Sequence, residues 1–431
     1  MQAQPRDPVW RQALAGSQML FVAFGALVLM PLVTGMDPNV ALFTAGVGTL
    51  IFHLITGNRV PIFLASSFAF IAPILAATND FGLPATLGGL VAAGLVYVAL
   101  AAAVRVKGVG LIDRLLPPVV VGPVIMCIGL GLSPVAANMV MGKTGDASAQ
   151  LIPYGTALLI SLPALLTTLI VAIVGRGLFR LVPILAGIAV GYALAWLLGV
   201  VDFSPIAAAP WLAMPKFVAP ELHWGAILFM IPVAIAPVIE HVGDMLAISA
   251  ATNNNYMRKP GLHRTLLGDG LATSAAALFG GPPNTTYSEV TGAVMLTRNF
   301  NPRIMLWAAG FAILLAFVGK FGAALHSIPV PVMGGILCLM FGSIAVVGLN
   351  TLIRHQVDLS EARNLVIVSV TLVFGIGGMV IGSGDVALKG ISLCGVVAIL
   401  LNLLLPGGQG WHGRMLDREP AASSQGAPLW P

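Results

Sequence analysis

Long apolar runs constrain the fold of this chain more than any other feature. Fourteen runs, bounded by charged residues, glycine or proline, occupy the sequence between residues 13 and 406. A helix needs about 20 residues to cross a hydrocarbon core. Two runs, at about 61–77 and 284–299, are short and interrupted. The other twelve have full length and cover about residues 13–34, 38–57, 84–104, 117–137, 151–175, 180–200, 223–250, 262–280, 304–320, 328–350, 363–382 and 387–406.

The low charge content indicates that lipid surrounds most of this chain. Only 9% of the 431 residues are charged, whereas a soluble domain carries about 25%. The mean hydropathy is +0.96. We therefore expect an all-α polytopic membrane protein with the lipid bilayer around most of its surface.

The basic residues test the number of crossings. With residue 1 in the cytoplasm and fourteen crossings, 17 of the 21 lysines and arginines fall on the cytoplasmic side. The other four, all lysines, fall outside: Lys143, Lys216, Lys320 and Lys389. Because cytoplasmic loops are enriched in basic residues, this predicts 14 transmembrane segments with both termini cytoplasmic. This distribution explains the net charge of +5, so no nucleic-acid partner is expected.

The segments divide evenly into two halves. Seven spans lie in residues 13–200 and seven in 223–406, joined by an extracytoplasmic linker at 201–222, which predicts two inverted repeats. The short, interrupted segments occupy the third position of each repeat, the arrangement that marks a transporter binding site. Residues 1–12 are expected to be a cytoplasmic N-terminus, and the Gly/Pro/Ser-rich residues 407–431 a disordered cytoplasmic tail.

Four acids fall inside apolar runs. A charge at the centre of a bilayer costs about 2.5–3.5 kcal/mol on insertion scales, so such residues usually face a cavity or a partner. Glu240 and Asp244 are four residues apart and share one helix face; a functional role is favoured over a structural polar patch. Asp269 lies between two glycines, and a role in helix packing and a functional role are equally favoured for this residue. The fourth acid is Glu289.

Glu289 lies where the second interrupted segment resumes as a helix. The free N–H groups and positive dipole of a helix start stabilise a carboxylate or a ligand carbonyl there. In the matching segment FLASSFAFIAP, we expect Ser66, Ser67 and Phe68 to be extended. Phe68 or Phe70 can stack on a flat ligand, although core packing is an equal or better explanation for these rings.

These groups together favour one type of ligand. Carboxylates accept N–H bonds, backbone amides donate to carbonyls, and an aromatic ring offers a flat surface. A flat heterocycle with alternating N–H and C=O groups fits this set, whereas the carboxylates repel an inorganic anion. Neither a metal-ligand pattern nor a nucleophile paired with a base is present, so we expect no enzyme, metal or cofactor.

The motifs IEHVGDM, GLHRTLLGDGLAT and PPNTTYSEVTGAVMLTR resemble those of the nucleobase–ascorbate transporter family, most closely its bacterial uracil permeases. With SQMLFVAFGALVLMP, GNRVPIFLASSFAFIAP and IPVPVMGGI, the similar pieces span residues 13–406 in order. The resemblance implies a core domain from spans 1–4 and 8–11, a gate domain from spans 5–7 and 12–14, a homodimer in the inner membrane, and nucleobase uptake coupled to protons.

The resemblance also implies residue roles. It places the substrate carboxylates at Glu240 and Glu289 and the backbone amide donors at Phe68 and Ser288. Asp244 joins the two glutamates as a candidate to carry the coupled proton. Supporting positions are Asp269, His241, Ser67 and Tyr287.

Several positions depart from the uracil permease pattern. Met19 and Asp244 replace histidines, Ser288 replaces a glycine, and Val290 replaces an asparagine. Asp244 and the glycines around Asp269 are more similar to purine transporters of the family. The sequence therefore predicts a uracil:proton symporter first, with a xanthine or urate symporter as the alternative. An anion transporter or channel on the same scaffold is less favoured.

Overall fold

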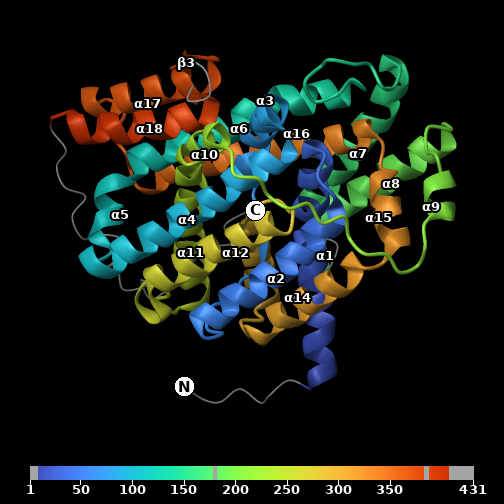
Figure 1. Cartoon of the computed structure of the whole chain (residues 1–431), viewed down its shortest axis with the longest axis horizontal. Coiled ribbons are helices and arrows are strands. Elements are labelled where there is room, and N and C mark those ends of the chain that lie inside the picture. Colours follow the sequence, from blue (N-terminus) through green and yellow to red (C-terminus); the bar gives the residue numbers. More distant parts are fainter. Residues whose placement is uncertain (1–7, 178–181, 383–387, 407–431) are drawn as a thin grey trace.

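The computed structural model describes residues 8–177, 182–382 and 388–406, and the part described is mostly helical. The predicted tail at 407–431 lies outside these ranges. Within these ranges, seven helical stretches are long and apolar enough to cross a membrane (Figure 1). They are α1 (Val9–Thr34), α2 (Pro38–Thr56), α4 (Leu83–Lys107), α6 (Pro118–Val140), α7 (Tyr154–Val174), α10 with α11 (Trp224–Thr252) and α16 (Val330–Arg354). A multi-span helical membrane protein is therefore confirmed.

Shorter helices fill the remaining apolar runs. They are α3 (Ile71–Phe81), α8 (Pro183–Leu197), α12 (Leu262–Leu278), α13 (Ser288–Thr297), α14 (Arg303–Ala316), α17 (Ala362–Ile376) and α18 (Gly390–Leu404). Among the described residues, three further α-helices were not predicted: α5 (Gly110–Leu115), α9 (Ser204–Ala208) and α15 (Gly319–His326). The run expected at 304–320 thus ends at Ala316, and a separate helix follows it.

Local signals fix the helix ends. Gly35 ends α1 with a positive φ of 75°, a conformation that glycine adopts at little cost. Pro38 then begins α2, and the carboxylate of Asp37 accepts a 2.7 Å hydrogen bond from the amide of Asn39. Glycine, an acidic cap and proline together make this turn between the first two long helices short.

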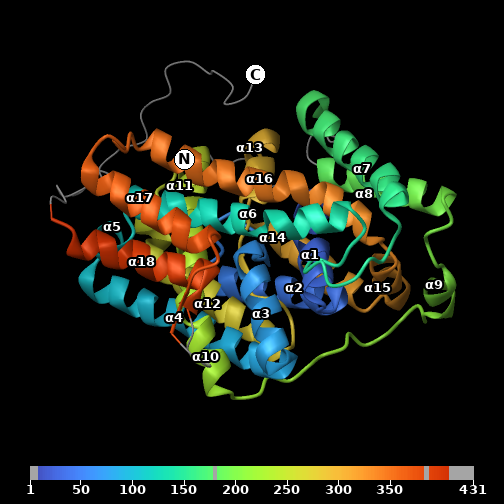
Figure 2. The same cartoon turned by 90° about the horizontal axis from the view of Figure 1, so that it is seen from above.

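The helices pack in two groups. In one group, α6 packs against α16, α17 and α18, and α7 packs against α8 and α16. In the other, α12 packs against α2 and α4, and α14 packs against α1 and α2. Figure 2 shows α6, α16 and α7 following one side of the molecule and α4, α12 and α2 on the other. Contacts between the groups are made largely by α11, α3 and α18.

Two short strands lie where the predicted interrupted segments are. β1 (Leu64–Ser66) and β2 (Asn284–Thr286) pair antiparallel, with Ala65 opposite Thr285. The expected extended stretches are confirmed, with one correction: Phe68 is not extended but begins the 3-10 helix η1 (Phe68–Phe70) that leads into α3. A second pair, β3 (Val380–Ile381) and β4 (Leu388–Lys389), precedes α18.

The glycines around Asp269 allow close packing of α12, as the sequence indicated. A Cβ added to Gly270 would lie 2.5 Å from the Cβ of Tyr97 and 2.7 Å from the carbonyl oxygen of Gly94 on α4. Any side chain there would displace one of the two helices. Asp269 is therefore held at a fixed depth in the helical core.

Candidate substrate-binding site

The β1–β2 pair lies where the two interrupted segments are not helical. Extended backbone cannot satisfy its own N–H and C=O groups, which is costly inside a membrane. Here the two strands satisfy each other, and the amide of Ser67 donates a 2.9 Å hydrogen bond to the carbonyl of Pro283. Helices start directly after each strand, so the first amides of η1 and α13, at Phe68 and Ser288, flank the strand pair.

Glu289 occupies the first turn of α13. Its side chain is exposed, while Tyr287 before it and Val290 after it are buried. The Tyr287 hydroxyl lies beside the Glu289 carboxyl and the carbonyl of Ala26. Within the described part of the chain, the hydroxyl forms no hydrogen bond of standard geometry. The helix dipole favours a negative group at this position, so Glu289 is an accessible and electrostatically supported acceptor.

Glu240 connects the acids into one cluster. It lies half-buried on α11, which packs against α13, β2 and α12. Its carboxyl interacts electrostatically with those of Asp244, Glu289 and Asp269. The structure therefore brings together all four acids that the sequence singled out, although they come from three different helices.

Two of these acids are tied to β2. Asp244 is 4% exposed and accepts a 2.8 Å hydrogen bond from the hydroxyl of Thr286. Asp269 is fully buried and accepts a 3.3 Å hydrogen bond from the hydroxyl of Thr285. Successive side chains of a strand point to opposite faces, so the two threonines anchor β2 to α11 on one side and to α12 on the other.

His241 lies behind the site. Its ring is completely buried, and Nδ1 is 3.1 Å from the Asp269 carboxylate. The edge of the ring faces Phe52 of α2, with 6.4 Å between ring centres. Glu240 and His241 are neighbours in sequence but point to different sides of α11, as the helical spacing indicated.

Aromatic side chains complete the surroundings. Phe68 is buried, and its ring meets Phe341 of α16 edge-on, with centres 6.3 Å apart and planes at 82°. The hydroxyl of Tyr97 on α4 is buried near Asp269 and Glu240. Sequence reasoning missed Phe341 and Tyr97, because each is one aromatic residue in an apolar helix without a motif. Ser67, expected to support the site, is also buried.

The site is rich in acceptors and poor in positive charge. No lysine or arginine occurs in residues 61–77, 235–252 or 284–297, which contain the strand pair and the helices of Glu240, Asp244 and Glu289. On α12, which carries Asp269, Arg264 lies in the first turn and is exposed. Within the described part of the chain, no group of three histidine, cysteine or acidic side chains is arranged to hold a metal ion. The chemistry that this arrangement offers is hydrogen bonding to an uncharged or cationic ligand.

Broken helices around an acidic cluster, inside a multi-span helical protein, define a membrane transporter. A family model described as the permease family, that of xanthine and uracil permeases, matches residues 11–384. The chain belongs to this family, the nucleobase–ascorbate transporters that its motifs resemble.

Individual relatives cover nearly the whole chain. A protein described as "Probable uracil permease" from Pasteurella multocida is 59% identical over 92% of this chain and 94% of its own length. The "Uracil permease" of Bacillus caldolyticus is 45% identical over 94% of both chains. Among solved structures, the transmembrane domain of the cyanobacterial bicarbonate transporter BicA superposes with a TM-score of 0.63. It covers 93% of this chain and 98% of its own at 16% identity, which shows a shared fold.

Proposed function

We propose that this protein takes up uracil together with protons. One observation carries the proposal: Glu240 and Glu289 lie in one cluster beside the helix starts at Phe68 and Ser288. Uracil presents two ring N–H groups and two carbonyls. The glutamates would accept the N–H bonds, and the amides of Phe68 and Ser288 would donate to the carbonyls. The similarity to uracil permeases selects this base among flat heterocycles.

Phe68 would cover one face of the bound base. Its ring is held edge-on by Phe341, which fixes the orientation of the ring beside the strand pair. Because Phe341 belongs to the group of helices around α6 and α16, the base would lie where the two groups meet.

Proton coupling would use the same acids. Placing several carboxylates together in a low-dielectric site favours protonation of at least one of them. Asp244 is engaged by Thr286, so Glu240 and Glu289 are better placed to exchange a proton with the substrate path. Protonation would lower the charge of the loaded site before it moves.

Alternating access would arise from the two packing groups. The group around α12 would form the core domain (spans 1–4 and 8–11) and the group around α6 and α16 the gate domain (spans 5–7 and 12–14), each built from both inverted seven-span repeats. Motion of the core against the gate would open the site to either side of the membrane. We further propose a homodimer in the inner membrane with both termini in the cytoplasm.

Uptake measurements test this function. Proteoliposomes containing the purified protein should accumulate labelled uracil when an inward proton gradient is imposed, and dissipating the gradient should reduce the uptake. No gradient-dependent uptake, together with no competition by any nucleobase, would contradict the proposal.

A purine is the second candidate, favoured by Asp244 and by the glycines around Asp269. Competition against labelled uracil by unlabelled xanthine or urate separates the two: stronger inhibition by a purine than by uracil itself identifies a purine symporter. The fold is shared with bicarbonate and other anion transporters, but the segments that carry the strand pair, Glu240 and Glu289 contain no lysine or arginine to hold an anion.

A further inference from the structure

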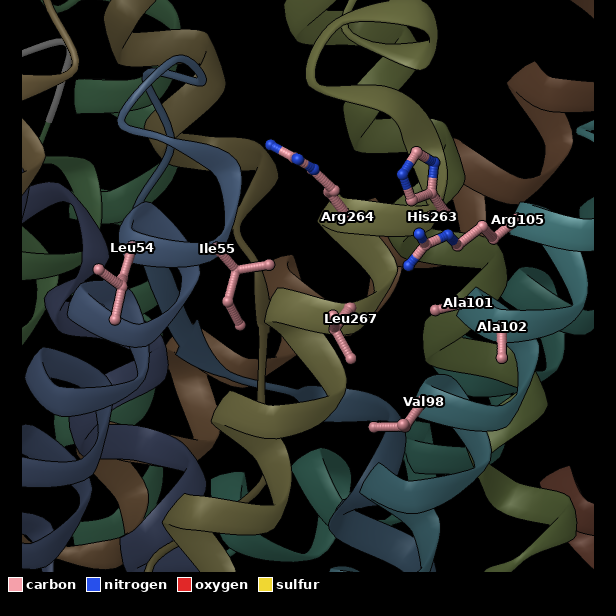
Figure 3. Close-up of a pocket in the computed structure, with 9 residues that line it drawn as sticks. All are labelled: Leu54, Ile55, Val98, Ala101, Ala102, Arg105, His263, Arg264 and Leu267. Carbon is pink, nitrogen blue, oxygen red and sulfur yellow. The ribbon is translucent and has the colours of Figure 1, made fainter.

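A pocket lies apart from the acidic site, between α2, α4 and α12 (Figure 3). Its volume is about 600 Å³, which falls in the range of about 300–1,000 Å³ that is typical of ligand sites. It opens where α2 and α4 end and α12 begins. None of the residues that line it belongs to the acidic cluster, so the proposed transport of uracil gives it no role.

The walls of this pocket are apolar. Leu54 and Ile55 come from α2, Val98 and Ala102 from α4, and Leu267 from α12. Figure 3 shows their side chains around the lower part of the opening. Leu54 is 83% exposed. Such a surface is unfavourable in water, but in a membrane-spanning bundle it offers contacts to a hydrocarbon chain.

One end of the pocket is positively charged. Figure 3 shows Arg105, His263 and Arg264 at this end, with the side chain of Arg105 directed toward the middle of the pocket and that of Arg264 directed away from it. Both arginines are exposed and lie near enough to the imidazole of His263 to act on it electrostatically. Within the described residues, no acidic side chain forms an ion pair with either arginine. Two uncompensated guanidinium groups therefore stand at the end of an apolar groove.

We propose that this pocket binds an anionic glycerophospholipid. One acyl chain would lie along Leu54, Val98 and Leu267, and the phosphate would bind Arg105 and Arg264. Guanidinium groups suit phosphate because they donate two parallel hydrogen bonds. Basic pockets between transmembrane helices are known to hold anionic lipid headgroups. The bound lipid would clamp together the helices that carry Tyr97 and Asp269, independently of which substrate is transported.

Native mass spectrometry of the delipidated protein tests the proposal. The probes are phosphatidylglycerol, the zwitterionic phosphatidylcholine of equal chain length, and glycerol 3-phosphate as a headgroup without chains. We expect phosphatidylglycerol to bind more tightly than phosphatidylcholine and glycerol 3-phosphate to bind weakly. The double variant R105Q/R264Q should weaken phosphatidylglycerol binding about 30-fold, since each basic residue near a membrane surface contributes about fivefold.

Two further variants separate headgroup from chain. Ala102→Trp fills the groove and should weaken binding of both lipids while leaving glycerol 3-phosphate unaffected. R303Q/R354Q removes the same charge from two exposed arginines that do not line the pocket, and it should bind lipid as the wild type does. A conservative variant, R105K/R264K, keeps the charge and should retain much of the binding if R105Q/R264Q fails to fold.

Three results would overturn the proposal. Wild-type phosphatidylglycerol binding by R105Q/R264Q removes the arginines from the site. Equal losses in R105Q/R264Q and R303Q/R354Q indicate a general effect of surface charge. Binding of glycerol 3-phosphate as tight as that of phosphatidylglycerol identifies a site for a soluble phosphate compound instead of a lipid.

Discussion

The hydroxyl of Thr286 donates a 2.8 Å hydrogen bond to the carboxylate of Asp244, and this bond joins the second strand of the site to α11. Both groups are buried. The bond explains how a strand of three residues keeps its position beside the helix that carries Glu240. Asp244 therefore has a structural role, and for this reason the proposed proton exchange uses Glu240 and Glu289 instead.

Thr286→Val should destabilise the site. Valine has nearly the same shape but lacks the donor, and a hydrogen bond to a charged group contributes about 1.5–3 kcal/mol. We expect a lower Tm of the detergent-purified protein and weaker uracil binding by calorimetry. Thr286→Ser keeps the hydroxyl and serves as the control. A valine variant with wild-type Tm and uracil affinity would show that the bond is unimportant.

Glu289→Gln should impair substrate binding without unfolding the protein. The substitution removes the negative acceptor, and the loss of about 1.5–3 kcal/mol for a charged hydrogen bond corresponds to about 10- to 150-fold in uracil Kd. Glu240→Gln should behave in the same way. Glu221→Gln, the same change at an exposed residue outside the site, is the matched control. Near-normal uracil binding by Glu289→Gln would exclude Glu289 from the site.

Phe341→Ala should weaken uracil binding through Phe68. The edge-on contact between the two rings, with 6.3 Å between centres, is of a kind that contributes about 0.5–1.5 kcal/mol. Without it, Phe68 loses its fixed orientation, and we expect uracil Kd to rise about 2- to 10-fold. Phe341→Tyr retains the ring and should bind as the wild type does. Unchanged binding by the alanine variant would argue against Phe68 as a substrate contact.

Gly270→Ala should lower the thermal stability. The added Cβ would lie 2.5 Å from Tyr97 and 2.7 Å from the Gly94 carbonyl, and overpacking of this kind costs about 1–3 kcal/mol. At Gly131 on α6 an added Cβ meets no atom within 4 Å, so Gly131→Ala should leave the Tm unchanged. Thermal unfolding in detergent compares the two. Equal Tm values would show that α4 and α12 separate easily.

The sequence by itself determined the membrane-spanning class, the two interrupted segments and the identity of the four acids that lie within apolar runs. It did so because lipid imposes strict physical limits: spans must be long and apolar, and a charge or a break inside one is costly. The sequence predicted an extended stretch in each interrupted segment, placed at Ser66, Ser67 and Phe68 in the first, and it placed Glu289 at a helix start.

Only the tertiary structure decided how these pieces meet. The pairing of β1 with β2 joins segments about 220 residues apart, and no local pattern encodes such a register. Asp244 and Asp269 are anchored by neighbouring threonines while Glu289 stays accessible, a distinction that depends on which strand packs beside each helix. Phe341 and the basic end of the α2–α4–α12 pocket also come from segments distant in sequence, because packing alone brings their side chains to one place.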